Sequence, residues 1–531
     1  MVGRVLIIGG GIAGLTVAME CREAGAEVEI CEREQRWGGK AVSYRLGAEE
    51  GIPGVPVEHS LRSFGSVYYS LLETMRRIPC DEGNAFDMLR PVSGVILRGA
   101  GGVTTQISAA LDQPAWRQCL DFHLAMRRFG VPFRDFSFWL GRIARYVLGS
   151  DALRAAVAAT RFDEHFQLRR RSPEFANFIL AFADIVFAAK PDASAATVIE
   201  LFALVMLARY INPYSLTHRI NITRGPVNEC FVDPWAALLR QLGVTMHLGA
   251  RADSIEWTGS SVGKHIAAIR FADRSRRTAD AYVLAVPPLT IGELAPDLYA
   301  NSILPRMRRE WSAGVQIILS RIPKEIVARD CMTMFLASPW AIVTVLEATP
   351  LWEGVPMPPG VAGVLSATIS RFDSPGIIHC KPFSDCNEDE VLDEVLAQIA
   401  LSDRGAIIGM HAGTLLSRLS AAELADGANG VFRGWEAGAA DSSGHLWATS
   451  AALSIFSPES GIKGAPVTTS HPDLFLAGEF TGTAMKIPTM EKANQAGKLC
   501  AAAVLASLGL QYDQSRCIPP VSGLVRRLLR I

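Results

Sequence analysis

The segment that most constrains the fold lies near the N-terminus, where glycines interrupt a short apolar run. Residues 5–8 are β-formers, and residues 15–21 repeat apolar side chains at helical spacing. Between them Gly9, Gly11 and Gly14 fit the spacing G-x-G-x-x-G. Such glycines permit a tight turn, close approach of a pyrophosphate and close packing of a helix on a strand. The segment therefore predicts a dinucleotide-binding βαβ unit, with a glycine-rich structural turn as the alternative.

A second apolar strand, predicted over residues 28–31, ends on an acidic residue. Glu32 lies 18 positions after Gly14, close to the roughly 20 expected for an acid that binds a ribose. A phosphate would lie at the N-terminus of the intervening helix, and Ile12 and Ala13, between the glycines that precede it, are further candidates for cofactor binding. Charged residues at positions 20, 22 and 23 interrupt the apolar stretch, so we expect neither a leader peptide nor a membrane span here.

Composition excludes several other classes of function. Lys plus Arg number 52 and Asp plus Glu 53, so nothing in the net charge favours nucleic acid as a partner. Hydrophobic residues make up 49% of the 531 and charged residues 20%, which suits a buried apolar cavity or contact with a membrane. The ten cysteines show neither C-x-x-C pairs nor zinc spacing. They predict reduced, mostly buried thiols, no metal site and a cytoplasmic protein.

The chain alternates between two textures. From about residue 114 to 211 it carries long, strongly apolar helical patterns, which indicate either an ordinary helical core or the lining of a substrate tunnel. Strand and helix patterns typical of a nucleotide domain resume after this block and return near the C-terminus. A chain of this length exceeds what one core usually supports, so we expect two domains interleaved in sequence.

Three further segments carry a resemblance to a known family. "EREQRWGGK" places Gly38, Gly39 and Lys40 shortly after Glu32, and two glycines beside a cation suit a pyrophosphate. "EHSLRSFG" follows, and "LFLAGEFTGT" with "TMEKANQAGK" stands near the C-terminus. In these motifs the chain resembles the FAD-dependent flavoprotein superfamily of amine oxidases, carotenoid desaturases and hydroxysqualene dehydroxylases. It is most similar to phytoene and carotene desaturase-like proteins, although Ser60 stands where relatives usually have glycine.

The resemblance implies an α/β fold with a discontinuous, Rossmann-like FAD-binding domain of the glutathione reductase type. We expect that domain at residues 1–100, 221–295 and 461–515, and a mixed β-sheet substrate domain with a helical insertion at 101–220 and 296–460. By this resemblance Gly478 and Glu479 approach the ribityl chain and phosphates, and Met490 begins a helix that faces the flavin. The residues expected to bind FAD are Gly9, Gly11, Ile12, Ala13, Gly14, Glu32, Arg33, Gly38, Gly39, Lys40, Glu58, His59, Ser60, Ala252, Gly478, Glu479, Thr489 and Met490.

The same resemblance raises two kinds of flavin chemistry. Amine oxidases typically hold a lysine near the flavin, whereas the matching strand here, "SAGVQIILS", offers Gln316. Their aromatic pair is matched only by Phe475 and Phe480. We therefore favour hydride exchange with a large apolar isoprenoid, polyene or polyketide-derived substrate, by desaturation or by reduction or reductive cyclisation. Candidate proton-handling residues are His59, Arg62, Tyr68 and Lys486.

Several questions stay open at the level of sequence. The electron partner is NADPH, a quinone or oxygen, and a non-enzymatic prenyl- or lipid-binding module of the same fold remains an alternative. Residues 516–531 form a basic amphipathic tail in which Arg526, Arg527 and Arg530 alternate with apolar side chains. Peripheral contact with anionic lipid through this tail is a hypothesis, with a frayed basic tail as its alternative.

Overall fold

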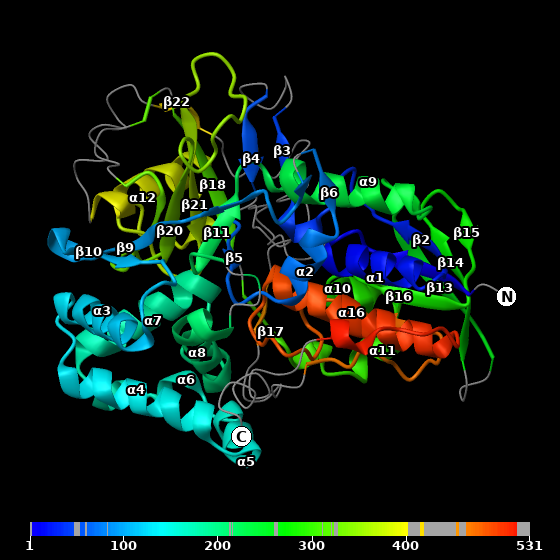
Figure 1. Cartoon of the computed structure of the whole chain (residues 1–531), viewed down its shortest axis with the longest axis horizontal. Coiled ribbons are helices and arrows are strands. Elements are labelled where there is room, and N and C mark those ends of the chain that lie inside the picture. The colour runs from blue at the N-terminus through cyan, green and yellow to red at the C-terminus, as the bar shows by residue number, and fades with distance from the viewer. Residues whose placement is uncertain are drawn as a thin grey trace.

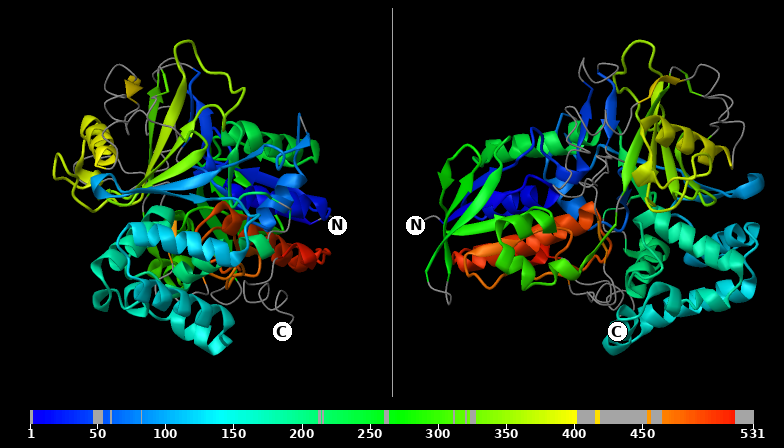
Figure 2. Two further views of the ribbon diagram at one scale, coloured as in Figure 1. Left: turned by 60° about the vertical axis from the view of Figure 1, so that its left-hand side comes forward. Right: turned by 180° about the vertical axis from the view of Figure 1, so that it is seen from behind.

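Two large sheets, the helices that pack on them and a separate layer of helices dominate the molecule (Figure 1). The computed structural model describes residues 3–46, 54–58, 61–81, 83–211, 214, 216–259, 264–310, 312–319, 321–322, 328–401, 415–418, 453–455 and 464–517. The views in Figure 2 agree that the separate layer of helices, within residues 115–211, lies against the larger, seven-stranded sheet and away from the N-terminal strands.

The first sheet has five parallel strands, gathered from distant parts of the chain. Their order across the sheet is β12-β2-β1-β16-β24. The strands are β1 (Arg4–Ile8), β2 (Glu27–Cys31), β12 (Thr245–His247), β16 (Ala281–Leu284) and β24 (Leu474–Leu476). All of them fall within the ranges that the sequence assigns to the FAD-binding domain. With the helices that pack on it, this parallel sheet forms the Rossmann-like α/β element that the sequence predicts.

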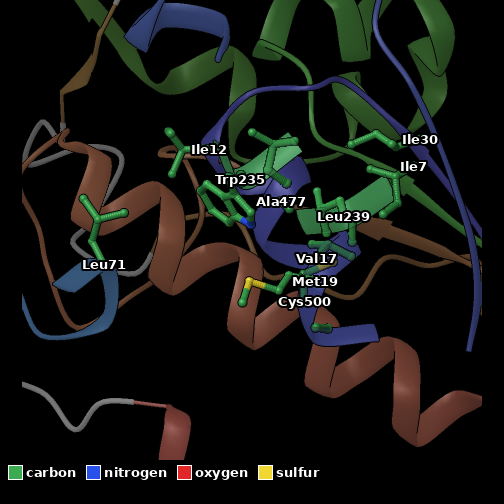
Figure 3. Close-up of a cluster of buried hydrophobic side chains, with 14 of the residues drawn as sticks. Ile7, Ile12, Val17, Met19, Ile30, Leu71, Trp235, Leu239, Ala477 and Cys500 are labelled. Carbon is green, nitrogen blue, oxygen red and sulfur yellow. The ribbon is translucent and has the colours of Figure 1, made fainter. Parts of the chain in front are cut away.

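Alternate residues of these strands point into two different cores. Val5 and Ile7 join the cluster that also holds Trp235 and Cys500, whereas Leu6 and Ile8 join the cluster on the opposite face. This is the period of two expected for a strand buried on both faces. The first cluster, shown in Figure 3, packs α1 (Ile12–Glu23), α9 (Asp233–Gln241) and α16 (Met490–Ser507) against one face of the sheet. A three-stranded antiparallel sheet of β13 (Ala252–Thr258), β14 (His265–Phe271) and β15 (Arg276–Arg277) lies on the other.

The second sheet is mixed and has seven strands in the order β10-β9-β19-β20-β21-β18-β22. Only β9 and β19 pair in parallel. Its strands are β9 (Gly94–Arg98), β10 (Thr104–Ser108), β18 (Ala313–Leu319), β19 (Cys331–Phe335), β20 (Ile342–Glu347), β21 (Gly363–Ile369) and β22 (Leu415–Arg418). Helix α12 (Glu388–Ala400) packs on one face. Because β9 belongs to this sheet, the first segment of the chain crosses between the two sheets a few residues before position 100, the boundary that the sequence predicts.

Helices fill the segment whose periodicity predicts them. They are α3 (Ala115–Arg128), α4 (Phe133–Leu148), α5 (Asp151–Ala158), α6 (Phe162–His165), α7 (Pro173–Phe187) and α8 (Ala195–Ile211). Aromatic side chains hold the layer together: Phe122 stacks on Trp139 at 5.3 Å between ring centroids, and Phe182 stacks on Phe202 at 5.4 Å. The same hydrophobic core includes Met332, Met334 and Val343 from the second sheet, so the helices pack against that sheet. The apolar side chains of these helices therefore form a hydrophobic core. That the same helices also line a substrate tunnel stays a prediction.

Shorter elements link these layers. The strands are β3 (Ser43–Arg45), β4 (Pro56–Glu58), β5 (Phe64–Gly65), β6 (Pro79–Cys80), β7 (Gly83–Asn84), β8 (Leu89–Pro91), β11 (Ile220–Thr223), β17 (Arg308–Glu310) and β23 (Leu453–Ile455). The helices are α2 (Ser70–Arg76), α10 (Pro288–Leu294) and α11 (Pro296–Ala300), with a π-turn at Asn228–Val232 that leads into α9. Among the described residues, no helix has the length and apolar character needed to cross a bilayer.

Candidate functional site

The glycines after β1 are held by packing at two of their three positions. Gly9 has φ +108°, and a Cβ there would lie 2.4 Å from the carbonyl oxygen of Ala285. A Cβ on Gly14 would lie 1.9 Å from the carbonyl oxygen of Gly9. A Cβ on Gly11, by contrast, would meet only the Cα of Gly39, at 3.9 Å. Gly11 is thus free of the packing demand that fixes its neighbours, which leaves close approach of a ligand as the reason for glycine there.

The first turn of α1 offers its backbone N–H groups beside this glycine. Gly11 is the N-cap residue and provides no capping side chain, and the helix continues through Ile12 and Ala13. The first N–H groups of a helix lack intrahelical acceptors and carry the positive end of its dipole. Together with the open side of Gly11, they form a cradle that fits a pyrophosphate.

Glu32 lies directly beside the glycine turn, as its spacing predicts. Its buried carboxylate accepts the N–H of Gly10 at 2.6 Å and the N–H of Glu34 at 2.9 Å. Burial raises the pKa of this carboxyl, and the two backbone donors oppose that shift. Each oxygen keeps a lone pair that a ribose hydroxyl could use. Arg33 is exposed and forms an ion pair with Glu34 at 3.1 Å.

The residues expected to bind FAD also include Ala252, the first residue of β13. The chain that leads to it runs along Glu32: the N–H of Ala250 donates to the Glu32 carbonyl at 2.8 Å, and the N–H of Glu32 donates to the His247 carbonyl at 2.9 Å. This pairing places the approach to β13 beside the predicted ribose ligand.

The second glycine pair packs against the first. Gly38 donates its N–H to the Gly10 carbonyl at 2.9 Å and forms a bridge with Gly11. Gly38 and Gly39 have φ of +117° and +55°, values that L side chains rarely adopt. The Nζ of Lys40 lies 3.2 Å from Oε1 of Glu479, although the two residues are 439 positions apart. The fold thereby brings three separately predicted cofactor motifs to one place.

Gly478 precedes that glutamate and is constrained by an aromatic ring. A Cβ on Gly478 would lie 2.2 Å from Cε1 of Phe480. Phe480 is buried in the core beneath the first sheet, and Phe475 is buried in the core on its other face. The two rings lie in separate cores, so they do not face each other across a space for a substrate.

A cluster of buried charges, the carboxyl cluster, comprises Glu58 at the end of β4, Arg62 just after it and Glu347 at the end of β20. Burial raises the pKa of both carboxyls, and the guanidinium of Arg62 opposes the shift in each. Burial also lowers the pKa of Arg62 to about 10. An Nη of Arg62 donates a short hydrogen bond to the Lys40 carbonyl, which joins this cluster to the second glycine pair. His59 and Ser60 lie outside the described residues.

Gln316 connects this cluster to the mixed sheet. Its side-chain N–H donates to the Glu58 carbonyl at 3.0 Å and to the Ser366 hydroxyl at 2.9 Å. Ser366 also bonds to the Glu347 carboxyl. Oε2 of Glu347 and Oε1 of Gln316 are buried and accept no hydrogen bond from the residues that the structure describes. The strand position that would carry an amine oxidase's lysine therefore carries a neutral amide, beside two carboxyls whose burial favours the protonated form.

The N-terminus of α16 is the third place where predicted residues meet. The Thr489 hydroxyl caps the helix by accepting the N–H of Lys492 at 3.2 Å, so Met490 is its first residue. Tyr68 forms a hydrogen bond with Thr489, and burial raises the pKa of the Tyr68 phenol. This confines Tyr68 to the segment that the resemblance places against the flavin.

The adjacent Glu491 has a different task. Its buried carboxylate accepts the N–H groups of Tyr69, Ser70 and Leu71 at 3.2, 3.0 and 2.8 Å, and the amide of Gln495 at 2.7 Å. It thereby satisfies the N–H groups at the start of α2. Glu491 fixes α2 to α16 and so holds Tyr68 beside Thr489.

A second group of buried charges, the lysine cluster, spans the boundary between α16 and the helical layer. It comprises Lys486, Lys492, Glu200 of α8 and Tyr146 of α4. The Tyr146 hydroxyl donates to Oε1 of Glu200 at 2.8 Å, and the Nζ of Lys486 donates to the Thr483 carbonyl at 2.6 Å. Oε2 of Glu200 is buried and has no hydrogen-bond partner among the described residues.

The charges of this cluster perturb one another. Burial raises the pKa of Glu200 to about 7, against the attraction of Lys486 and the hydrogen bond from Tyr146. Burial lowers the pKa of Lys492 to about 7 and also lowers that of Lys486, whereas the charge of Glu200 raises both. Groups with pKa values near neutrality beside a cofactor site are suited to proton transfer.

Of the four candidate proton-handling residues, three are described and all three are at least partly buried near cofactor motifs. Arg62 lies in the carboxyl cluster, Tyr68 at the start of α16 and Lys486 in the lysine cluster. The sequence analysis missed Glu347, Glu200, Tyr146 and Lys492. A single acid inside an otherwise apolar run, as in "AATVIELFALVM" and "WAIVTVLEA", is the signal that could have identified the two carboxyls.

The described residues contain no group of three or more His, Cys, Asp or Glu side chains placed to hold a metal ion. All ten cysteines are free thiols, and burial raises the pKa of Cys21 and Cys500.

Comparison with known proteins matches a family described as flavin containing amine oxidoreductase over residues 12–320. Zeta-carotene desaturase of Synechocystis sp. is 37% identical over 75 residues, which cover only 14% of each chain. Among solved structures, putrescine oxidase bound to putrescine superposes with a TM-score of 0.62 at 13% identity, over 95% of this chain and 99% of that one. An oxidoreductase from Methanosarcina mazei superposes with a TM-score of 0.57 at 12% identity, over 95% and 100%. At these identities the structural likeness concerns the fold alone.

Proposed function

The chain belongs to the flavin-containing amine oxidoreductase family, and within it we propose that the protein exchanges hydride with a large hydrophobic isoprenoid, polyene or polyketide-derived substrate. Its cofactor is FAD. The open side of Gly11, the buried acid Glu32 and the pair Lys40–Glu479 support binding of this cofactor. When bound, FAD supplies the hydride acceptor or donor, and the chain's own residues bind it, exclude water and manage protons.

The observation that carries the proposal is the environment of Gln316. Amine oxidases typically place a lysine here, whereas Gln316 is a buried amide already bonded to the Glu58 carbonyl and to Ser366. The candidate aromatic pair, Phe475 and Phe480, is buried in two separate cores. These features argue against an amine substrate. The local similarity to zeta-carotene desaturase supports an apolar polyene instead.

Glu200 is the residue that we propose to transfer the proton. It comes from α8, in the apolar helical layer, and couples electrostatically to Lys486, which precedes α16, and to Lys492 in its first turn. Tyr146 holds one of its carboxyl oxygens at 2.8 Å and leaves Oε2 available. A carboxyl with a pKa near 7 can serve as an acid in a reductive reaction or as a base in desaturation.

Replacing Glu200 with glutamine is expected to lower the rate of the substrate step about 100-fold or more. In a reductive reaction the wild-type rate should fall above about pH 7, because the acid is then deprotonated; in desaturation it should fall below about pH 7, because the base is then protonated. The glutamine variant should lose this limb of the profile. Anaerobic stopped-flow traces of flavin absorbance measure both effects, with substitution of the exposed Glu174 of α7, Glu174→Gln, as the matched control.

A second measurement on the same variant needs no substrate. Because the folded-state pKa of Glu200 is raised, its proton stabilises the folded state fully below about pH 4.5, and this contribution is lost as the pH rises through about 7. Urea unfolding of FAD-saturated protein should therefore show the wild type losing more stability than Glu200→Gln between these pH values. Parallel profiles would contradict the assigned pKa, and an unchanged rate in the variant would exclude Glu200 from proton transfer.

The class of reaction is tested by the mass of the product. Purified holoprotein is incubated with a long acyclic polyene, once with a quinone and once with NADPH. Desaturation removes two hydrogen atoms and requires the quinone or oxygen as acceptor, whereas reduction or reductive cyclisation adds two and requires NADPH as donor. We expect one of these changes in mass. Unchanged polyene under both conditions, with flavin bound, would contradict hydride exchange with this substrate class.

A further inference from the structure

Helix α3 turns an apolar stripe outward. Trp116, Leu120 and Leu124 follow one another at intervals of four residues, so they lie along one side of the helix. Their exposed fractions are 66%, 40% and 47%. Phe133, at the start of α4, is 66% exposed, and its ring packs 5.2 Å from that of His123 on α3. We call these four side chains the α3 stripe.

Exposed large hydrophobic side chains are concentrated in the α3 stripe. Eleven large hydrophobic side chains of the described residues are exposed, and four of them fall between positions 116 and 133. Single exposed apolar residues need no explanation, whereas neighbouring ones on one surface indicate a contact. The opposite side of α3 is already used, because Phe122, Ala125 and Met126 pack into the core of the helical layer. Figure 1 shows α3 at the outer edge of that layer, remote from α1 and α16.

Arginines accompany the stripe. At 100° per residue, Arg127, Arg117 and Arg128 lie within about 120° of Trp116, in the arc that Leu120 and Leu124 share. All three are exposed, as is Arg134 beside Phe133. Asp121 offsets Arg117 through an ion pair at 3.2 Å. The surface is therefore locally basic in a chain whose net charge is −1.

We propose that the α3 stripe and its arginines bind the surface of an anionic lipid bilayer. Apolar side chains enter the boundary between headgroups and acyl chains, and arginines beside them pair with lipid phosphates. A second copy of this chain fits the face poorly, because a two-fold contact through it would gather the exposed arginines of both copies in one interface. This inference does not depend on the flavin chemistry. The surface is also distinct from the C-terminal tail, whose residues 518–531 lie outside the described residues.

The test is sedimentation of the full-length holoprotein with vesicles. One set contains phosphatidylcholine with phosphatidylserine, and the other contains phosphatidylcholine alone. We expect binding to the anionic set and a much weaker association with the neutral set. Trp116→Ser combined with Leu120→Ser should lower the partition coefficient at least tenfold, and Arg127→Glu with Arg128→Glu should lower it about 100-fold.

Two matched controls keep the result specific. Leu148→Ser removes a residue that is 69% exposed at the far end of α4, roughly 22 Å along that helix from Phe133. Arg306→Glu reverses an exposed charge elsewhere. Both should bind as the wild type does. Wild-type protein that fails to sediment, or stripe variants that bind unchanged, would overturn the proposal, as would a dimer that the stripe variants dissociate.

A spectroscopic readout guards against misfolded variants. Brominated phosphatidylcholine in the anionic vesicles should quench part of the tryptophan fluorescence, and Trp116→Phe should remove most of that quenching while binding persists. Quenching that is the same in Trp116→Phe would show that another surface enters the bilayer and would overturn the proposal.

Discussion

Protein carrying Gly11→Ala is expected to fold normally and to purify without FAD. A Cβ at this position meets only Cα of Gly39, at 3.9 Å, so the packing of β1 on α1 is undisturbed. It would, however, occupy the space through which the pyrophosphate approaches the start of the helix. We expect the Kd for FAD to rise on the order of 100-fold, equivalent to about 2.7 kcal/mol. Visible absorbance of the purified variant, followed by titration with FAD, measures the effect.

The control for this variant is Gly141→Ala, since a Cβ there meets no atom within 4 Å and the residue lies within helix α4. It should retain FAD and gain about 1 kcal/mol or less of stability from helix propensity. Wild-type affinity for FAD in Gly11→Ala would show that the cradle does not hold the pyrophosphate.

Glu491→Ala is expected to cost about 3 to 5 kcal/mol of folding free energy. The substitution leaves the N–H groups of Tyr69, Ser70 and Leu71 without the buried carboxylate that accepts them now. Detaching α2 from α16 should also free Tyr68 from Thr489 and weaken FAD binding. Denaturant unfolding of FAD-saturated protein is the measurement.

Two substitutions bracket that prediction. Glu491→Gln keeps a neutral acceptor and should lie between the wild type and the alanine variant. Glu293→Ala removes an exposed carboxylate from α10 and should change stability by about 0.5 kcal/mol or less. A cost for Glu491→Ala as small as that for Glu293→Ala would mean that the start of α2 finds other acceptors.

Local spacing explains why much of the cofactor site could be predicted from sequence. Gly14 is fixed by the carbonyl oxygen of Gly9, five positions away, and the positive φ of Gly9 belongs to the turn itself, so a short motif reveals both glycines although Gly9 also packs on the distant Ala285. Glu32 is equally local, because it directly follows the strand that pairs with β1. The pairing of Lys40 with Glu479 was less accessible: each motif indicated the cofactor, but only the fold shows that the two side chains meet.

The chemical residues escaped prediction for the opposite reason. Glu200 lies in a helix whose apolar pattern indicates core, and its role depends on Tyr146, Lys486 and Lys492, which come from other elements. Glu347 likewise ends a buried strand and acquires its environment from Glu58 and Arg62, almost 300 positions away. Burial and long-range charge set these pKa values, and neither is encoded in the local spacing of residues.

The central claim, that the flavin exchanges hydride with an apolar polyene and not with an amine, is tested most directly by anaerobic spectroscopy of the purified holoprotein. The flavin absorbance is recorded after mixing with a long acyclic polyene and, separately, with a primary diamine; both are then repeated after reduction by NADPH. We predict that the polyene either bleaches the oxidised flavin or, after reduction by NADPH, reoxidises the flavin and restores its visible bands. The diamine should do neither. Bleaching by the diamine, with no response to any polyene, would contradict the account.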